Sequence, residues 1–165
     1  MSWSIHVIPL HDAAEEGVLA WAAAASSTRG VPLVAPAPEP LPSVADVLVS
    51  FRDAGCHGTA WFTVTDAAAA PALAECPDPR VCAETGGLDL GEVGLRAVGG
   101  SDAVSPGDEV EAISFRKPSG VAVLTAVCRL ASAAGPQLVF DDSADRVFVI
   151  RPNEDPDDLV GEWPW

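Results

Sequence analysis

The clearest pattern of apolar and polar positions lies between residues 43 and 54. Apolar side chains recur there at i, i+3, i+4 and i+7, the spacing of one face of a helix: Val44, Val47, Leu48 and Phe51. Ser43 and Asp46 form a capping-box pattern at the start, and Gly55 follows the end. We therefore predict a helix over residues 43–54.

A second stretch with the same logic runs from residue 119 to residue 134. Its apolar stripe consists of Val121, Leu124, Cys128 and Ala131. Ser119 precedes it as a cap, and Gly135 with Pro136 ends it. The pattern predicts a helix over residues 119–134, with its stripe packed on a sheet.

Alternation with a period of two, or runs of β-branched and aromatic residues, predicts strands elsewhere. The predicted strands cover residues 3–10, 57–65, 92–98, 109–116, 137–141 and 146–150. The last two flank a polar turn and form a C-terminal hairpin. Shorter helices are predicted after Asp12, ending before Gly30, and over residues 66–75. Residues 76–91 have the composition of a loop.

This order of elements predicts an α+β fold, with one mostly antiparallel sheet and two main amphipathic helices packed on it. Residues 31–42 hold five prolines, which predicts a stiff extended crossover. We expect a single domain over residues 1–152. Residues 153–165 are expected to form an acidic C-terminal tail that contains tryptophan.

The charge of the chain excludes some classes of partner. The 165 residues include 24 acidic and 9 basic side chains, for a formal net charge of −15, and Lys117 is the only lysine. Direct binding to nucleic acid or to an anionic membrane needs basic side chains, so neither is expected. The N-terminus lacks the pattern of a secretory signal, and we expect a cytoplasmic protein.

The C-terminal part carries the densest charge. Residues 139–162 hold eight acidic and two basic side chains, and the chain then ends in Trp-Pro-Trp. Tryptophan is enriched in protein interfaces, so these rings either cap the protein's own core or contact a partner or a second copy of the chain. The predicted binding residues are Asp155, Asp157, Asp158, Glu162, Trp163 and Trp165.

The cysteines suggest reduced thiols rather than a metal centre. Cys56 and His57 are neighbours on a predicted strand and so point to opposite faces. Cys76 and Cys82 have a C-x5-C spacing, which differs from the usual zinc knuckle, and a disulfide between them would need an oxidising environment. We therefore predict no stoichiometric zinc, no metal ligand and no cofactor.

Acidic side chains at the hairpin offer little sign of catalysis. Asp141 and Asp142 stand where turn residues are expected, and no nucleophile elbow or metalloprotease motif is present. No catalytic residue is therefore predicted. A small enzyme with a pocket near Cys56 and His57, or near Asp141, remains an alternative, as does a homo-oligomeric adaptor.

The leading expectation is a small acidic interaction protein that binds and neutralises or regulates a basic partner, such as a toxin or a nucleic-acid-binding protein. Immunity proteins against bacterial toxins share this general character: they are small, acidic and α+β, and they lack a catalytic motif. The likeness is one of character alone, because no motif identifies a family. A homodimer is a further expectation.

Overall fold

Both main helices form where the apolar spacing places them. The computed structural model describes residues 3–12, 17–34, 36–66, 72–85 and 87–165.

Helix α2 spans Val44–Asp53, and Ser43 caps it: its hydroxyl accepts a hydrogen bond from the Asp46 backbone N–H, while the Asp46 carboxylate accepts one from the Ser43 N–H, both at 3.1 Å. Helix α4 spans Gly120–Ala134. Phe51 and Leu124 are fully buried, which confirms that both helices bury an apolar face. The predicted stripe of α4 is corrected at one position, because Val121 is 47% exposed, whereas Cys128 and Ala131 are buried.

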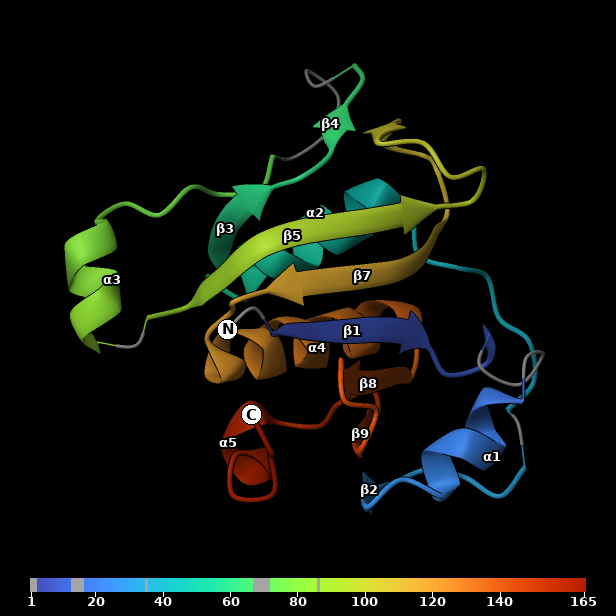
Figure 1. Cartoon of the computed structure of the whole chain (residues 1–165). Helices are drawn as coiled ribbons and strands as arrows, with labels where there is room; N and C mark the ends of the chain where they lie inside the picture. Colours follow the sequence, from blue (N-terminus) through green and yellow to red (C-terminus); the bar gives the residue numbers. More distant parts are fainter. Residues whose placement is uncertain (1–2, 13–16, 35, 67–71, 86) are drawn as a thin grey trace.

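The helices pack on a seven-stranded sheet (Figure 1). Its order is β2-β9-β8-β1-β7-β5-β3. The strands are β1 (Ser4–Pro9), β2 (Ser27–Arg29), β3 (His57–Ala60), β5 (Asp89–Ala97), β7 (Val110–Arg116), β8 (Gln137–Asp141) and β9 (Arg146–Ile150). A separate pair joins β4 (Thr63–Val64) to β6 (Ala103–Val104). Strands β8 and β9 form the predicted C-terminal hairpin.

The α+β class is confirmed, but the expected mostly antiparallel sheet is corrected to a mixed one. The interior pairings are antiparallel, whereas both edge strands pair in parallel: β2 with β9, and β3 with β5. Parallel neighbours need a long crossover connection. Strand β2 is far from β9 in sequence, and α3 (Pro79–Thr85) lies in the connection from β3 to β5.

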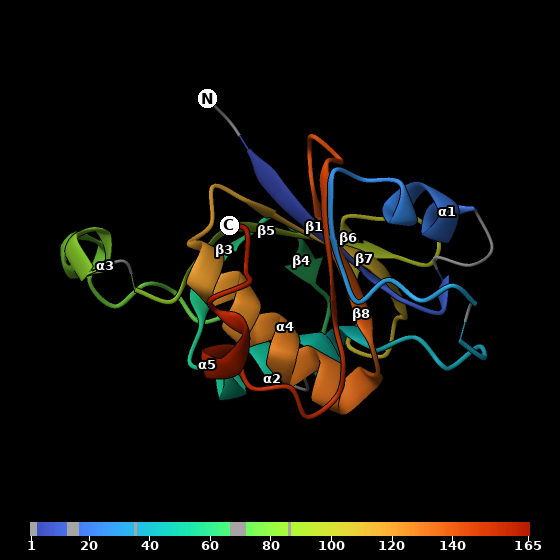
Figure 2. The same cartoon turned by 90° about the horizontal axis from the view of Figure 1, so that it is seen from below.

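Helices cover both faces of the sheet at its β8–β9 end. Figures 1 and 2 show α2 and α4 on one face and α1 (Val18–Ala23) on the other. Successive side chains of β9 point to opposite faces of the sheet. Phe148 packs in the core beneath α4, and Val149 packs in a second core cluster that includes Ala22 of α1. Strand β9 is therefore apolar on both faces.

Several predicted elements are shorter than expected. Helix α1 ends at Ala23 and is followed by β2, so Gly30 does not end it; residues 13–16 of this prediction lie outside the described residues. The predicted strand over 57–65 is divided between β3 and β4.

Two differences concern the middle of the chain. The predicted loop over 76–91 contains α3 and the start of β5. Residues 67–71 of the predicted alanine-rich helix lie outside the described residues, and 72–76 are not helical. The described part of the crossover, residues 31–34 and 36–42, forms neither helix nor strand, as its prolines predict.

The C-terminal segment packs against the rest of the fold. Its short helix α5 (Pro156–Leu159) lies beside α4 (Figure 2). Leu159 and Trp163 belong to the same buried cluster as Leu124, Cys128 and Ala131 of α4. None of the helices in the described ranges has the length and apolar content that crossing a bilayer requires.

Candidate functional site

Three predicted binding residues are exposed acids on one anchored segment. The side chains of Asp155, Asp157 and Asp158 face solvent at α5. Asp155 also caps this helix, because its carboxylate accepts a hydrogen bond from the Asp157 backbone N–H at 2.8 Å. In the described part of the chain no ion pair includes any of the three. The exposed Glu162, by contrast, pairs with Arg29 at 3.3 Å.

The two C-terminal tryptophans fold back onto the protein. Trp163 is 8% exposed, and its indole N–H donates to the Gly120 carbonyl at 2.9 Å. The Trp165 indole donates to the Asp141 carboxylate at 2.9 Å, and the two rings meet edge to face with centroids 4.8 Å apart. Of the two roles left open by the sequence, the structure adopts the intramolecular one, and the buried Trp163 is not presented to a partner.

The first residue of α4 explains how the chain end fits there. A Cβ at Gly120 would collide with the carbonyl of Trp165. Glycine is a poor helix former, but here its missing side chain admits the C-terminus against α4. The position therefore couples the start of α4 to the fold-back of the tryptophans.

The neighbouring carboxylates Asp141 and Asp142 take separate structural partners. Burial raises the pKa of Asp141, but hydrogen bonds from Ser143 and Trp165 outweigh it, and the net shift is downward. A hydrogen bond with His6, at 2.9 Å, lowers the pKa of Asp142. Neither group has the raised pKa expected of a general acid, so the turn interpretation fits both.

A pH dependence follows from the Asp142 contact. The pKa of this carboxyl is lower in the folded protein than in the unfolded chain, where it is about 3.9. The contact therefore stabilises the fold above that pH, and this contribution is lost as the pH falls through the folded-state pKa. Asp142→Asn should lower stability modestly at neutral pH, and its effect should shrink as the pH falls through the folded-state pKa, because the carboxyl is then protonated in both states.

Urea unfolding of both proteins at neutral pH and at a series of acidic pH values would measure this difference. The exposed Asp102 offers a control, because Asp102→Asn removes the same charge without touching His6. An Asp142→Asn variant as stable as wild type at neutral pH would show that the contact contributes nothing.

Cys56 and His57 diverge as strand geometry predicts. The thiol of Cys56 is buried and donates to the Ala122 carbonyl of α4 at 3.5 Å. Burial raises its pKa to about 11, so it is protonated at neutral pH. His57 contacts Cys82 instead. The two neighbours therefore do not form a catalytic pair with each other.

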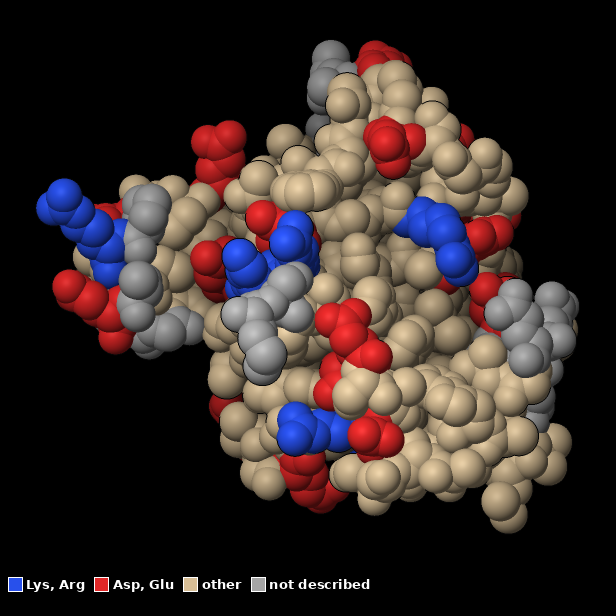
Figure 3. Space-filling model, viewed as in Figure 1, with Lys and Arg blue, Asp and Glu red and all other residues tan. Residues whose placement is uncertain are grey.

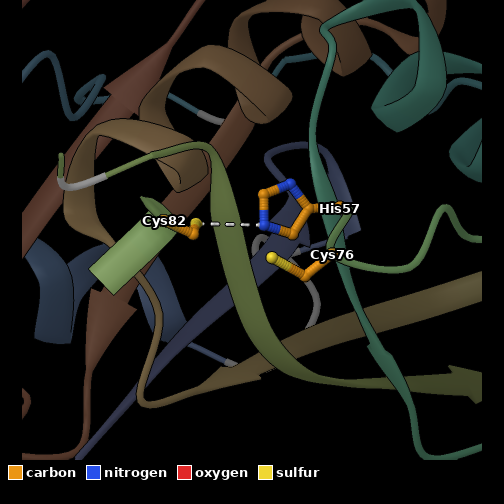
Figure 4. A group of neighbouring side chains, drawn as sticks. All are labelled: His57, Cys76 and Cys82. Atoms are coloured by element: carbon orange, nitrogen blue, oxygen red, sulfur yellow. Dashed lines mark hydrogen bonds between the residues drawn. The ribbon is translucent and has the colours of Figure 1, made fainter. Parts of the chain in front are cut away.

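His57 meets Cys76 and Cys82 at one side of the molecule. Figure 4 shows the three side chains pointing toward one another, from β3, the following loop and α3. The imidazole Nε2 lies 3.2 Å from the Cys82 Sγ, and the ligand atoms of all three residues lie within 4.8 Å of one another. Both cysteines are free thiols. The spacing of these residues along the chain does not predict this convergence.

A cavity of about 760 Å³ adjoins this cluster. Both thiols line it, together with Glu75, Asp89, Lys117 and Ser119. Partial desolvation, the Cys76 thiol and the Asp89 carboxylate raise the pKa of Cys82, which therefore lacks the electropositive setting of an activated thiolate. The cavity wall therefore combines soft sulfur donors with charged groups of both signs, and the imidazole of His57 lies beside its Cys82 thiol.

No family model, curated protein or solved structure matches this chain in the comparisons made. The role of the protein must therefore be inferred from its own surface and side chains. Two places stand out for that purpose: the exposed acids of α5, and the cluster of His57, Cys76 and Cys82 beside the cavity.

Proposed function

We propose that this protein is a small acidic interaction module that binds a basic partner protein and neutralises or regulates it. The observation that carries the proposal is the set of three exposed acids at α5, which have no ion pair in the described part of the chain. Figure 3 shows acidic and basic side chains interspersed on the face it presents, whereas the three acids of α5 are close together in the sequence with no basic residue between them.

The fold holds these acids in fixed positions. Leu159 is 4% exposed and Trp163 is 8% exposed, so α5 is anchored at its end and beyond it. Charges on an anchored segment lose less conformational freedom on binding than charges on a free tail. The formal charge of −15 adds long-range attraction for a positive surface, which raises the association rate.

The proposed partner is a basic protein, and the proposed compartment is the cytoplasm. A basic toxin or a nucleic-acid-binding protein offers the complementary charge, and an immunity or inhibitor role would follow from covering its active surface. The four cysteines are free thiols, which suits a reducing compartment such as the cytoplasm. A homo-oligomeric adaptor is less favoured, because the tryptophans that would serve it are folded back.

The test compares charge at α5 with equal charge elsewhere. The basic partner is first recovered from the native host with wild-type bait and identified. Replacing Asp155, Asp157 and Asp158 together by asparagine should slow its association several-fold at low ionic strength, and the difference should vanish at high salt. Asparagine retains the cap of α5, so stability should change little.

The control variant neutralises three exposed acids: Asp66 after β4, Asp102 before β6 and Glu109 before β7. It changes the net charge by the same amount, and Figure 1 places this region far from α5. If the two variants associate at the same rate, the net charge acts without a specific role for α5. If neither differs from wild type at any salt concentration, acidic steering is not part of the function.

A second candidate is a small enzyme that works in the cavity beside His57. The 3.2 Å approach of the imidazole to Cys82 favours it over a pocket at Cys56 or Asp141. Cys56 points into the core, and Asp141 is occupied by Ser143 and Trp165. Thiol labelling across pH would test this candidate, since a catalytic Cys82 should react at neutral pH much faster than the buried Cys128.

A further inference from the structure

We propose that His57, Cys76 and Cys82 form a zinc-binding site whose fourth coordination position opens into the adjoining cavity. This site is separate from α5 and does not depend on the proposed interaction function. It revises the expectation of no stoichiometric zinc. That expectation rested on sequence spacing, and the structure brings His57 together with Cys76 and Cys82.

The distances between donor atoms suit a tetrahedral ion. Zinc binds sulfur at about 2.3 Å and imidazole nitrogen at about 2.0–2.1 Å, which places neighbouring donors about 3.5–3.8 Å apart in a tetrahedron. The imidazole Nε2 of His57 is 3.2 Å from the Cys82 Sγ, and no pair of ligand atoms in the cluster exceeds 4.8 Å. Small side-chain movements would complete the geometry.

The chemistry of the three donor atoms also determines which metal ion they prefer. Two thiols and one imidazole match the borderline-soft character of Zn²⁺, whereas Mg²⁺ and Ca²⁺ prefer oxygen ligands. Cys56 does not take part, since its thiol donates to Ala122 in the core. In the described part of the chain no other histidine, cysteine or carboxylate joins the three.

Backbone hydrogen bonds fix each of the three segments. The His57 N–H donates to the Leu88 carbonyl at 3.0 Å and aligns β3 with β5. The next residue, Gly58, donates to the Ala74 carbonyl at 2.9 Å and holds the chain before Cys76 beside β3. The Cys82 N–H donates at 3.0 Å to the carbonyl of Asp78, which directly precedes α3.

A glycine leaves room for one of the thiols. A Cβ at Gly87 would lie 2.5 Å from the Cys82 Sγ, so any other residue at this position would displace the thiol. The absence of a side chain there keeps the sulfur directed at His57. The cluster therefore has the space that a ligand position needs, as well as the donors.

The fourth position faces the cavity because both thiols line it. Structural zinc sites use four protein ligands, whereas three protein ligands with water in the fourth position characterise catalytic sites. A cavity of about 760 Å³ can admit water and a small ligand beside the ion. Zinc would also tie α3, which projects away from the sheet in Figures 1 and 2, to β3.

Cobalt binding to the full-length reduced protein tests the site. After treatment with a chelator, Co²⁺ should bind at one ion per chain, with thiolate-to-cobalt charge-transfer absorption and the strong visible bands of tetrahedral Co²⁺, and Zn²⁺ should displace it. His57→Ala, Cys76→Ala and Cys82→Ala should each weaken Co²⁺ binding at least about 100-fold. Loss of a residue that only hydrogen-bonds to a metal ligand weakens metal binding by up to about 100-fold, and loss of a ligand itself should cost at least as much.

The matched controls are Cys56→Ala and Cys128→Ala, which remove thiols buried in the core. Both should keep the stoichiometry and spectrum of wild type. Circular dichroism of each chelator-treated variant separates loss of a ligand from loss of fold. A reduced wild-type protein that binds no Co²⁺ would overturn the site, as would Cys76→Ala and Cys82→Ala variants that bind it as tightly as wild type.

Azide tests the open position. Added azide should shift the visible bands of the cobalt protein, because it replaces water on the ion. Unchanged bands would show a fourth protein ligand and overturn the open position. The Asp89→Asn variant then identifies that ligand if its bands differ from those of wild type, since Asp89 lines the same cavity.

Discussion

Replacing Leu124 by alanine should lower the free energy of unfolding by about 2–5 kcal/mol. The side chain is fully buried in the cluster between α4 and the sheet, where it packs with residues of both. Truncation removes its apolar area from the core and leaves a cavity that the rigid sheet cannot fill. Urea unfolding followed by circular dichroism would measure the loss.

Val121 provides the matched control, since it lies one turn earlier on α4 and is 47% exposed. Val121→Ala should change the free energy of unfolding by no more than about 0.5 kcal/mol, as is usual for surface substitutions. Equal losses for the two variants would contradict the buried face of α4 in the structure, which includes Leu124 and leaves out Val121.

The sequence predicted α2 and α4 because each carries two independent signals. The apolar stripe gives the period, and a capping residue with a following glycine gives the ends. The inner strands were predicted for a similar reason, since alternation persists over enough residues to be distinguished from chance. Strand β2 spans only three residues, Ser27–Arg29, which is too short to show any alternation.

The two short helices α3 and α5 share a sequence signal at their start, which the overall composition of the surrounding residues does not reveal. Each begins with Asp-Pro: Asp78 before Pro79, and Asp155 before Pro156. Each aspartate accepts hydrogen bonds from backbone N–H groups of the first turn, and proline suits the first helical position because it has no N–H to satisfy. Pro79 lies in a stretch that has the composition of a loop, although proline at the first helical position favours a helix.

The cluster of His57, Cys76 and Cys82 could not be predicted from spacing. Spacing along the chain measures the length of the connection, whereas the approach of His57 depends on the parallel pairing of β3 with β5 and on the position of α3. Both features were absent from the predicted fold. The exposed acids at α5 were predictable, because the side chains of Asp155, Asp157 and Asp158 have no apolar surface to bury.

The largest loss of stability at the C-terminus is expected for Trp163→Ala, at about 3–5 kcal/mol. Its ring packs edge to face on Phe148 of β9, with centroids 5.0 Å apart, and its indole N–H bonds the Gly120 carbonyl. Truncation would remove a large buried apolar surface and leave that carbonyl without its indole donor. Thermal or urea unfolding of the full chain would measure the effect.

Two further variants separate the contributions. Trp163→Phe keeps an aromatic ring on Phe148 but loses the indole donor, so it should cost about 1–3 kcal/mol. Trp61→Ala removes a ring that is 59% exposed and lies 5.9 Å from the Arg116 guanidinium, and it should cost no more than about 1 kcal/mol. A Trp163→Ala protein as stable as wild type, but with a faster-dissociating partner, would show that the ring acts as an interface anchor in solution. A destabilised Trp163→Ala protein would instead make residues 153–165 part of the folding unit, and the acids of α5 would then be held in place by the same core that supports the sheet.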